Sequence, residues 1–158
     1  MLLKIDSLYK GKIVFYSETK VIFLFLFLIL ISVADIRFYK IPDSLLLSLF
    51  ALLVSLDVKT DFNNILIHIA SAILMFLIFF LIYKTVGGLG FGDVKFVGVL
   101  SYAMDFKIGV YAFLIASLSA IIFLLAKNYI SKKVSEKLPF APFLSLGSLI
   151  AFSVGEGV

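Results

Sequence analysis

The sequence predicts an all-α, polytopic membrane protein with about six transmembrane helices. Of its 158 residues, 63% are hydrophobic and 15% are charged, and the mean hydropathy is +1.18. Soluble domains carry about 25% charged residues. Apolar runs that approach the roughly 20 residues needed to cross a bilayer recur along the whole chain. These observations indicate a protein that lies mostly within the membrane.

Six apolar segments are expected to be the spans. They are residues 19–38, 41–56, 65–83, 92–106, 108–126 and 140–155. The second and fourth are short, because a helix of about 15 residues is only about 23 Å long, so they require local thinning of the bilayer or a water-filled dip. Residues 1–18 are expected to form an N-terminal segment outside the cytoplasm or at the membrane interface, and residues 19–158 a six-span core.

Positive charges give the expected orientation. With residues 1–18 outside, eight Lys and Arg residues lie on the inner connections and six on the outer side, as the positive-inside rule requires. The net charge of +4 is spread over the connections and indicates no nucleic-acid surface. An alternative is a secretory signal cleaved after Ser32-Val33-Ala34, which would leave Asp35 as the new N-terminus.

Composition limits the chemistry that the chain can perform. It has no cysteine and one histidine, His68, which excludes thiolate nucleophiles, disulfides and multi-histidine or cysteine metal sites. We therefore predict no metal site and no cofactor. Acid chemistry must come from the ten Asp and Glu residues.

Two of these acids, Asp35 and Asp93, are the candidate catalytic residues. Asp35 follows fourteen uncharged residues and lies about one turn before the end of the first span, and Asp93 opens the fourth span. Ionisable groups within spans are costly and usually face a cavity or a partner. The alternative is structural, since an acid at a helix start also caps the helix.

Gly90 and Gly92 directly precede Asp93. Without a β-carbon, they allow backbone conformations that other residues avoid and the close approach of another chain. A substrate peptide must be extended to be cleaved, so such access favours a peptidase. Gly-x-Gly-Asp alone is a weak pattern.

Three segments together carry a family resemblance. They are Asp35-Ile-Arg-Phe-Tyr-Lys-Ile-Pro42-Asp43, Gly90-Phe91-Gly92-Asp93-Val94-Lys95 and Pro139-Phe140-Ala141-Pro142-Phe143. In this order and spacing the chain resembles the type IV prepilin peptidase family of GxGD intramembrane aspartyl proteases. It is similar to the compact members that hold only the peptidase core, because it has no cysteine zinc domain.

The resemblance implies a function and its partners. Residues 19–158 are then the six-span peptidase core, with Asp35 and Asp93 as the catalytic pair at the cytoplasmic face of the inner membrane. The implied substrate is a prepilin or pseudopilin with a short basic leader and a hydrophobic helix, in contact with membrane lipid. The supporting motif residues are Gly90, Gly92, Lys95, Pro42, Asp43, Pro139 and Pro142.

Some residues have competing interpretations. Lys95 is two positions from Asp93 and so on another helix face, which favours an interfacial anchor over a catalytic group. A surface for a basic leader would need acids, and Asp43 and Glu136 are available. Pro42 and Pro139 are expected to begin or end helices, and His68 is expected to be structural.

Two other functional classes remain open from the sequence. A small ion- or proton-coupled transporter could use both carboxylates as a relay, although the inverted repeats of such proteins are not evident. A noncatalytic subunit of a secretion or pilus system would tolerate replacement of both aspartates. Among GxGD proteases, presenilin-like enzymes place a tyrosine where this chain has Ala34.

Overall fold

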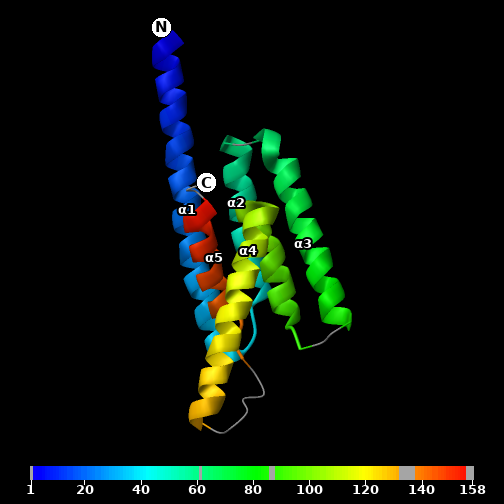
Figure 1. The fold of residues 1–158 in the computed structure, drawn as a ribbon. Coiled ribbons are helices and arrows are strands. Elements are labelled where there is room, and N and C mark those ends of the chain that lie inside the picture. The colour runs from blue at the N-terminus through cyan, green and yellow to red at the C-terminus, as the bar shows by residue number, and fades with distance from the viewer. Residues whose placement is uncertain (1, 61, 86–87, 132–137, 156–158) are drawn as a thin grey trace.

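The computed structural model is an all-helical bundle (Figure 1). It describes residues 2–60, 62–85, 88–131 and 138–155. Within these ranges every regular element is a helix: α1 (Leu2–Phe38), α2 (Asp43–Thr60), the 3-10 turn η1 (Phe62–Asn64), α3 (Ile65–Thr85), α4 (Phe91–Ser131) and α5 (Ala141–Gly155). The predicted all-α class is therefore confirmed.

The chain doubles back inside α4 at Asp105. The backbone angles there, φ 66° and ψ 162°, are not helical and lie in a region used almost only by glycine. A β-carbon placed on Gly109 would lie 3.5 Å from the Cα of Ser101, whereas eight residues of continuous helix would separate them by about 12 Å. The two halves of α4 thus run in opposite directions (Figure 1), as the predicted connection after residue 106 suggested.

The surface of the bundle is apolar. Large hydrophobic side chains are exposed along α3, among them Leu66, Ile73, Leu77 and Leu81, where a soluble helix would be polar. By length and composition, residues Thr19–Phe38, Ile65–Thr85 and Phe91–Lys127 could each cross a membrane, and Ala141–Val154 is a shorter apolar helix. This supports a membrane protein, while the number of six spans stays a prediction.

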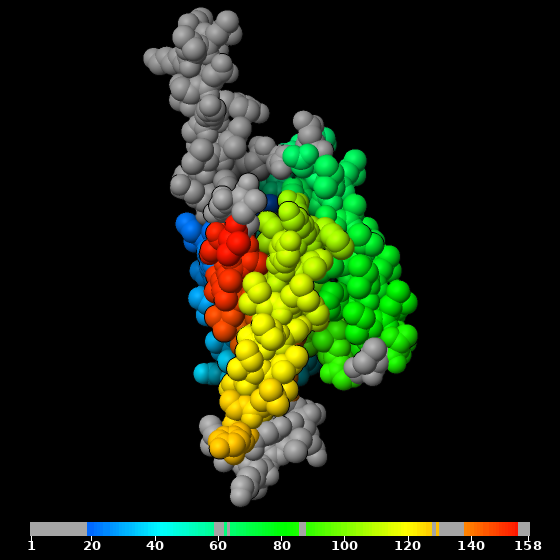
Figure 2. Space-filling model, viewed as in Figure 1, coloured from blue at the N-terminus to red at the C-terminus, as the bar shows by residue number. Residues whose placement is uncertain are grey.

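Close packing joins α5 to both of its neighbours. Figure 2 shows α5 between α1 and the second half of α4. A β-carbon on Gly147 would overlap the carbonyl oxygen of Ala112, so only glycine lets α5 approach α4 this closely. On the other side, the Ser32 hydroxyl donates to Ser145 Oγ at 2.9 Å. These contacts fix the start of α5 beside the end of α1.

Candidate active site

Asp35 lies in the last turn of α1, where the start of α5 holds its carboxylate. Its Oδ2 accepts a hydrogen bond of 2.9 Å from the backbone N–H of Ala141, the first residue of α5. The first N–H groups of a helix have no partner within it and attract a negative charge. Only 6% of Asp35 is exposed. The structure thus connects the segment from Pro139 to Pro142 to the site through the backbone of Ala141.

Helix α1 stops directly after this aspartate. The Tyr39 N–H donates to the Asp35 carbonyl at 2.8 Å, and Tyr39 takes the left-handed conformation with φ 49°, which usually ends a helix. The chain then turns through Ile41 and Pro42 into α2, which begins at Asp43. Pro42 and Pro139 both lie just before a helix, as predicted.

Asp93 is the third residue of α4 and folds back onto Gly90. Its N–H donates to the Gly90 carbonyl at 3.0 Å, and its carboxylate accepts a hydrogen bond from the Gly90 backbone, as in a capping box. A β-carbon on Gly90 would lie 2.9 Å from Asp93 Oδ2. Any side chain at position 90 would therefore displace the Asp93 carboxylate.

Gly92 has a different steric role. A β-carbon there would lie 3.2 Å from Cβ of Ile41 in the turn between α1 and α2, so the glycine allows α4 to begin close to that turn. Among the glycines that the structure describes, Gly88 is the one with positive φ. The expectation that Gly90 and Gly92 supply unusual backbone conformations is therefore wrong, because both are required for space.

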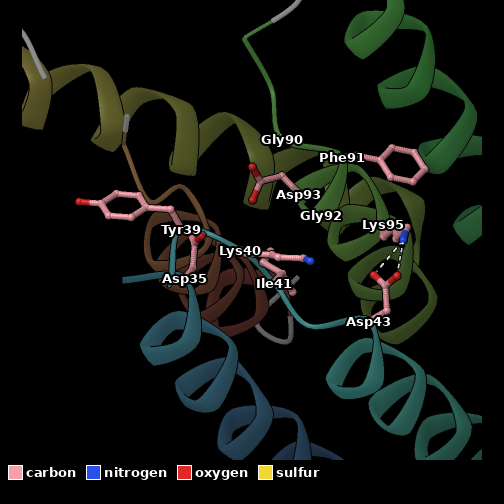
Figure 3. Close-up of a pocket in the computed structure, with 10 residues that line it drawn as sticks. All are labelled: Asp35, Tyr39, Lys40, Ile41, Asp43, Gly90, Phe91, Gly92, Asp93 and Lys95. Atoms are coloured by element: carbon pink, nitrogen blue, oxygen red, sulfur yellow. Dashed lines mark hydrogen bonds and ion pairs between the residues drawn. The ribbon is translucent and has the colours of Figure 1, made fainter. Parts of the chain in front are cut away.

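Asp35 and Asp93 line one cavity of about 380 Å³ (Figure 3). They are 58 positions apart in the sequence, and α1 and α4 bring them close enough for their charges to interact. The cavity wall consists of the end of α1, the turn after it and the starts of α2 and α4. Its residues are Asp35, Tyr39, Lys40, Ile41, Asp43, Gly90, Phe91, Gly92, Asp93 and Lys95.

An ion pair between Lys95 and Asp43 forms one side of the cavity (Figure 3). The Lys95 ammonium donates to both carboxylate oxygens of Asp43 at 2.8 Å and lies 4.7 Å above the centre of the Phe91 ring. The sequence pattern did not reveal this pair, because it joins residues 52 positions apart. Lys95 is thus a wall residue bound to Asp43. Asp43 and Glu136 were the acids suggested for leader binding, and Glu136 lies outside the described residues.

His68 on α3 pairs with Asp105 at 2.9 Å, and neither residue lines the cavity. In the described part of the chain, no three His, Asp or Glu side chains form a group that could hold a metal ion. Of the three carboxylates that line the cavity, Asp43 is paired with Lys95, whereas Asp35 and Asp93 accept hydrogen bonds from backbone N–H groups.

The chain is similar to known leader peptidases. Residues 22–125 match the type IV leader peptidase family. The chain is also 28% identical over 133 residues to a prepilin leader peptidase/N-methyltransferase of Bacillus subtilis (strain 168), an alignment that covers 83% of this chain and 54% of the relative. It thus spans about half the length of that relative. No solved structure matches.

Proposed function

Because the chain belongs to the type IV leader peptidase family, we propose that it is a membrane aspartyl endopeptidase that removes the short basic leader from type IV prepilins or pseudopilins. The proposed location is the cytoplasmic face of the inner membrane. The observation that carries the proposal is the placement of Asp35 and Asp93 in one cavity. The family match does not favour the alternative of an ion-coupled transporter.

Two adjacent carboxylates are suited to hydrolysis of a peptide bond. Both cannot readily be ionised at once, so the pair shares one proton and titrates as a unit. The ionised carboxylate removes a proton from water while the protonated one donates a hydrogen bond to the scissile carbonyl. The hydrogen bonds from Ala141 to Asp35 and from Gly90 to Asp93 hold the two groups in place.

The test is replacement of either aspartate by asparagine, which removes the acid chemistry with little change in shape. Wild type, Asp35→Asn and Asp93→Asn are co-expressed in membranes with a tagged prepilin, and the mass of the pilin product is measured. We expect wild type to remove the leader and both variants to leave it attached. The matched control is Asp6→Asn in the N-terminal segment, which is expected to cleave normally.

Cleavage by either site variant at the wild-type rate would contradict the assignment of the catalytic pair. Failure of wild type to cleave a panel of prepilins and pseudopilins would contradict the proposed function itself. Correct insertion of each variant is checked by its yield in the membrane fraction.

A further inference from the structure

A second hollow of about 280 Å³ lies between α2 and α4, next to the catalytic cavity. Its lining is Asp43, Leu46, Leu47, Phe50, Lys95 and Val99. The α2 members follow the spacing i, i+3, i+4 and i+7, and the α4 members the spacing i and i+4, so each set forms one helix face. We call this hollow the α2–α4 groove. It extends about 10 Å along α2 from Asp43.

The groove adjoins the catalytic cavity at the Asp43–Lys95 pair. Both residues line both hollows, so the pair is the wall between them. The Asp43 side chain is 70% exposed and that of Lys95 32% exposed. Exposed ion pairs contribute little to stability, and Lys95 has a second favourable contact in the Phe91 ring. Separating Lys95 from Asp43, which would open this wall, therefore costs little free energy.

Beyond the pair, the groove suits an apolar helix. Leu46, Leu47, Phe50 and Val99 form its lining, and Leu47 is 72% exposed. A peptide at membrane depth must satisfy its own backbone hydrogen bonds, which a helix does. Apolar side chains on one face of such a helix fit a groove of this kind.

A groove of equal volume between α1 and α5 provides a comparison. It is also about 280 Å³ and apolar, and Leu146 is part of its lining. None of its lining residues lines the catalytic cavity. Unlike the α2–α4 groove, it therefore shares no wall with the cavity that Asp35 and Asp93 line.

We propose that the α2–α4 groove binds the apolar helix of the peptide substrate that follows the scissile bond, with the Asp43–Lys95 pair at the boundary between extended and helical peptide. This rests on the proposed peptidase function and adds a binding surface to it. The scissile bond then lies between Asp35 and Asp93, and the helix leaves the cavity along Leu47 and Phe50.

Single cysteines test the proposal, because the chain has none of its own. Leu47→Cys and Leu146→Cys are made separately in the inactive Asp93→Asn chain. The probe is a co-expressed peptide with a lysine-containing leader, an apolar run of about 20 residues and one cysteine moved through that run. After oxidation, the cross-linked fraction is measured; a disulfide requires β-carbons about 4 Å apart.

We expect the Leu47→Cys chain to form cross-links with probe cysteines at positions three or four residues apart. The cross-linked fraction should be at least about tenfold above that of the Leu146→Cys chain. In the active chain, Leu47→Trp should raise KM for the probe about tenfold, the scale of a lost apolar contact, while Leu146→Trp leaves it unchanged. Equal cross-linking at both positions, stronger cross-linking at Leu146→Cys, or none at either would overturn the proposal. Such a result with normal wild-type cleavage rejects the groove alone, whereas loss of wild-type cleavage rejects the peptidase function.

Discussion

The backbone N–H of Ala141 orients one of the two candidate catalytic carboxylates. This donor lies at the start of a helix and is fully buried, so the hydrogen bond to Asp35 is shielded from water and fixes the direction of the carboxylate. A backbone donor has no signature in the sequence. The sequence indicated only that Ala141 lies between Pro139 and Pro142, where a helix is expected to begin.

Ala141→Pro is expected to lower kcat about 10- to 100-fold. Proline removes the N–H but is accepted at the first position of a helix, and a hydrogen bond to a charged group contributes about 1.5–3 kcal/mol. Cleavage of a prepilin by purified protein is the measurement. Ala141→Val is the control, because it adds similar bulk and keeps the N–H. Equal loss of activity in both variants would assign the effect to packing.

A buried ion pair joins α1 to α2 at the end of the bundle opposite to the cavity. The Lys20 ammonium donates to both oxygens of Asp57 at 2.9 and 3.1 Å and lies 5.9 Å above the Tyr102 ring. Only 3% of the Asp57 side chain is exposed. The charge of Lys20 is therefore balanced within the protein. Lys20 thus counts for less among the six basic residues that are expected to lie on the outer side.

Lys20→Met is expected to destabilise the fold by about 3–5 kcal/mol, since it leaves a buried carboxylate without its partner. The measurement is the thermal unfolding midpoint in detergent. The double variant Lys20→Met/Asp57→Leu should recover most of the loss, because no charge is then buried. Lys107→Met, at an exposed position, is the control. If the double variant is as unstable as the single one, the ion pair is not the cause.

In the whole molecule, the reversal at Asp105 divides α4, so the described part of the chain has six α-helical segments. Asp35, Lys40 and Asp93 lie toward the end of the bundle that holds the cavity. Asp57, His68 and Asp105 lie toward the opposite end of the bundle. Arg37, Lys40 and Lys84 all lie at the cavity end, as expected for a cytoplasmic face.

Single-cysteine labelling tests this arrangement directly. Lys107→Cys is expected to react in intact cells with a membrane-impermeant maleimide, whereas Lys40→Cys should react only after permeabilisation. Both positions are exposed, so differences in reaction report the side of the membrane. Labelling of both cysteines from one side would contradict the six-span topology, and a reversed pattern would contradict the orientation.

Hydropathy predicted the helices well because it depends on local composition. The expected boundary at residue 106 lies beside the reversal at Asp105, and the segments expected at 65–83 and 140–155 agree with α3 and α5. The candidate pair, Asp35 and Asp93, lines one cavity. Contacts between elements were not predictable, because the Asp43–Lys95 pair and the spacing of Gly92 from Ile41 depend on how distant helices pack.

The contact between Asp35 and α5 also sets an order of events during synthesis. Asp35 leaves the ribosome early and Asp93 later, but the donor at Ala141 follows both. Until the last helix has packed against Ser32 and Ala112, the first carboxylate lacks the hydrogen bond from the Ala141 N–H. Under the proposed peptidase function, we therefore expect the chain to stay inactive during synthesis until α5 has packed against the rest of the bundle.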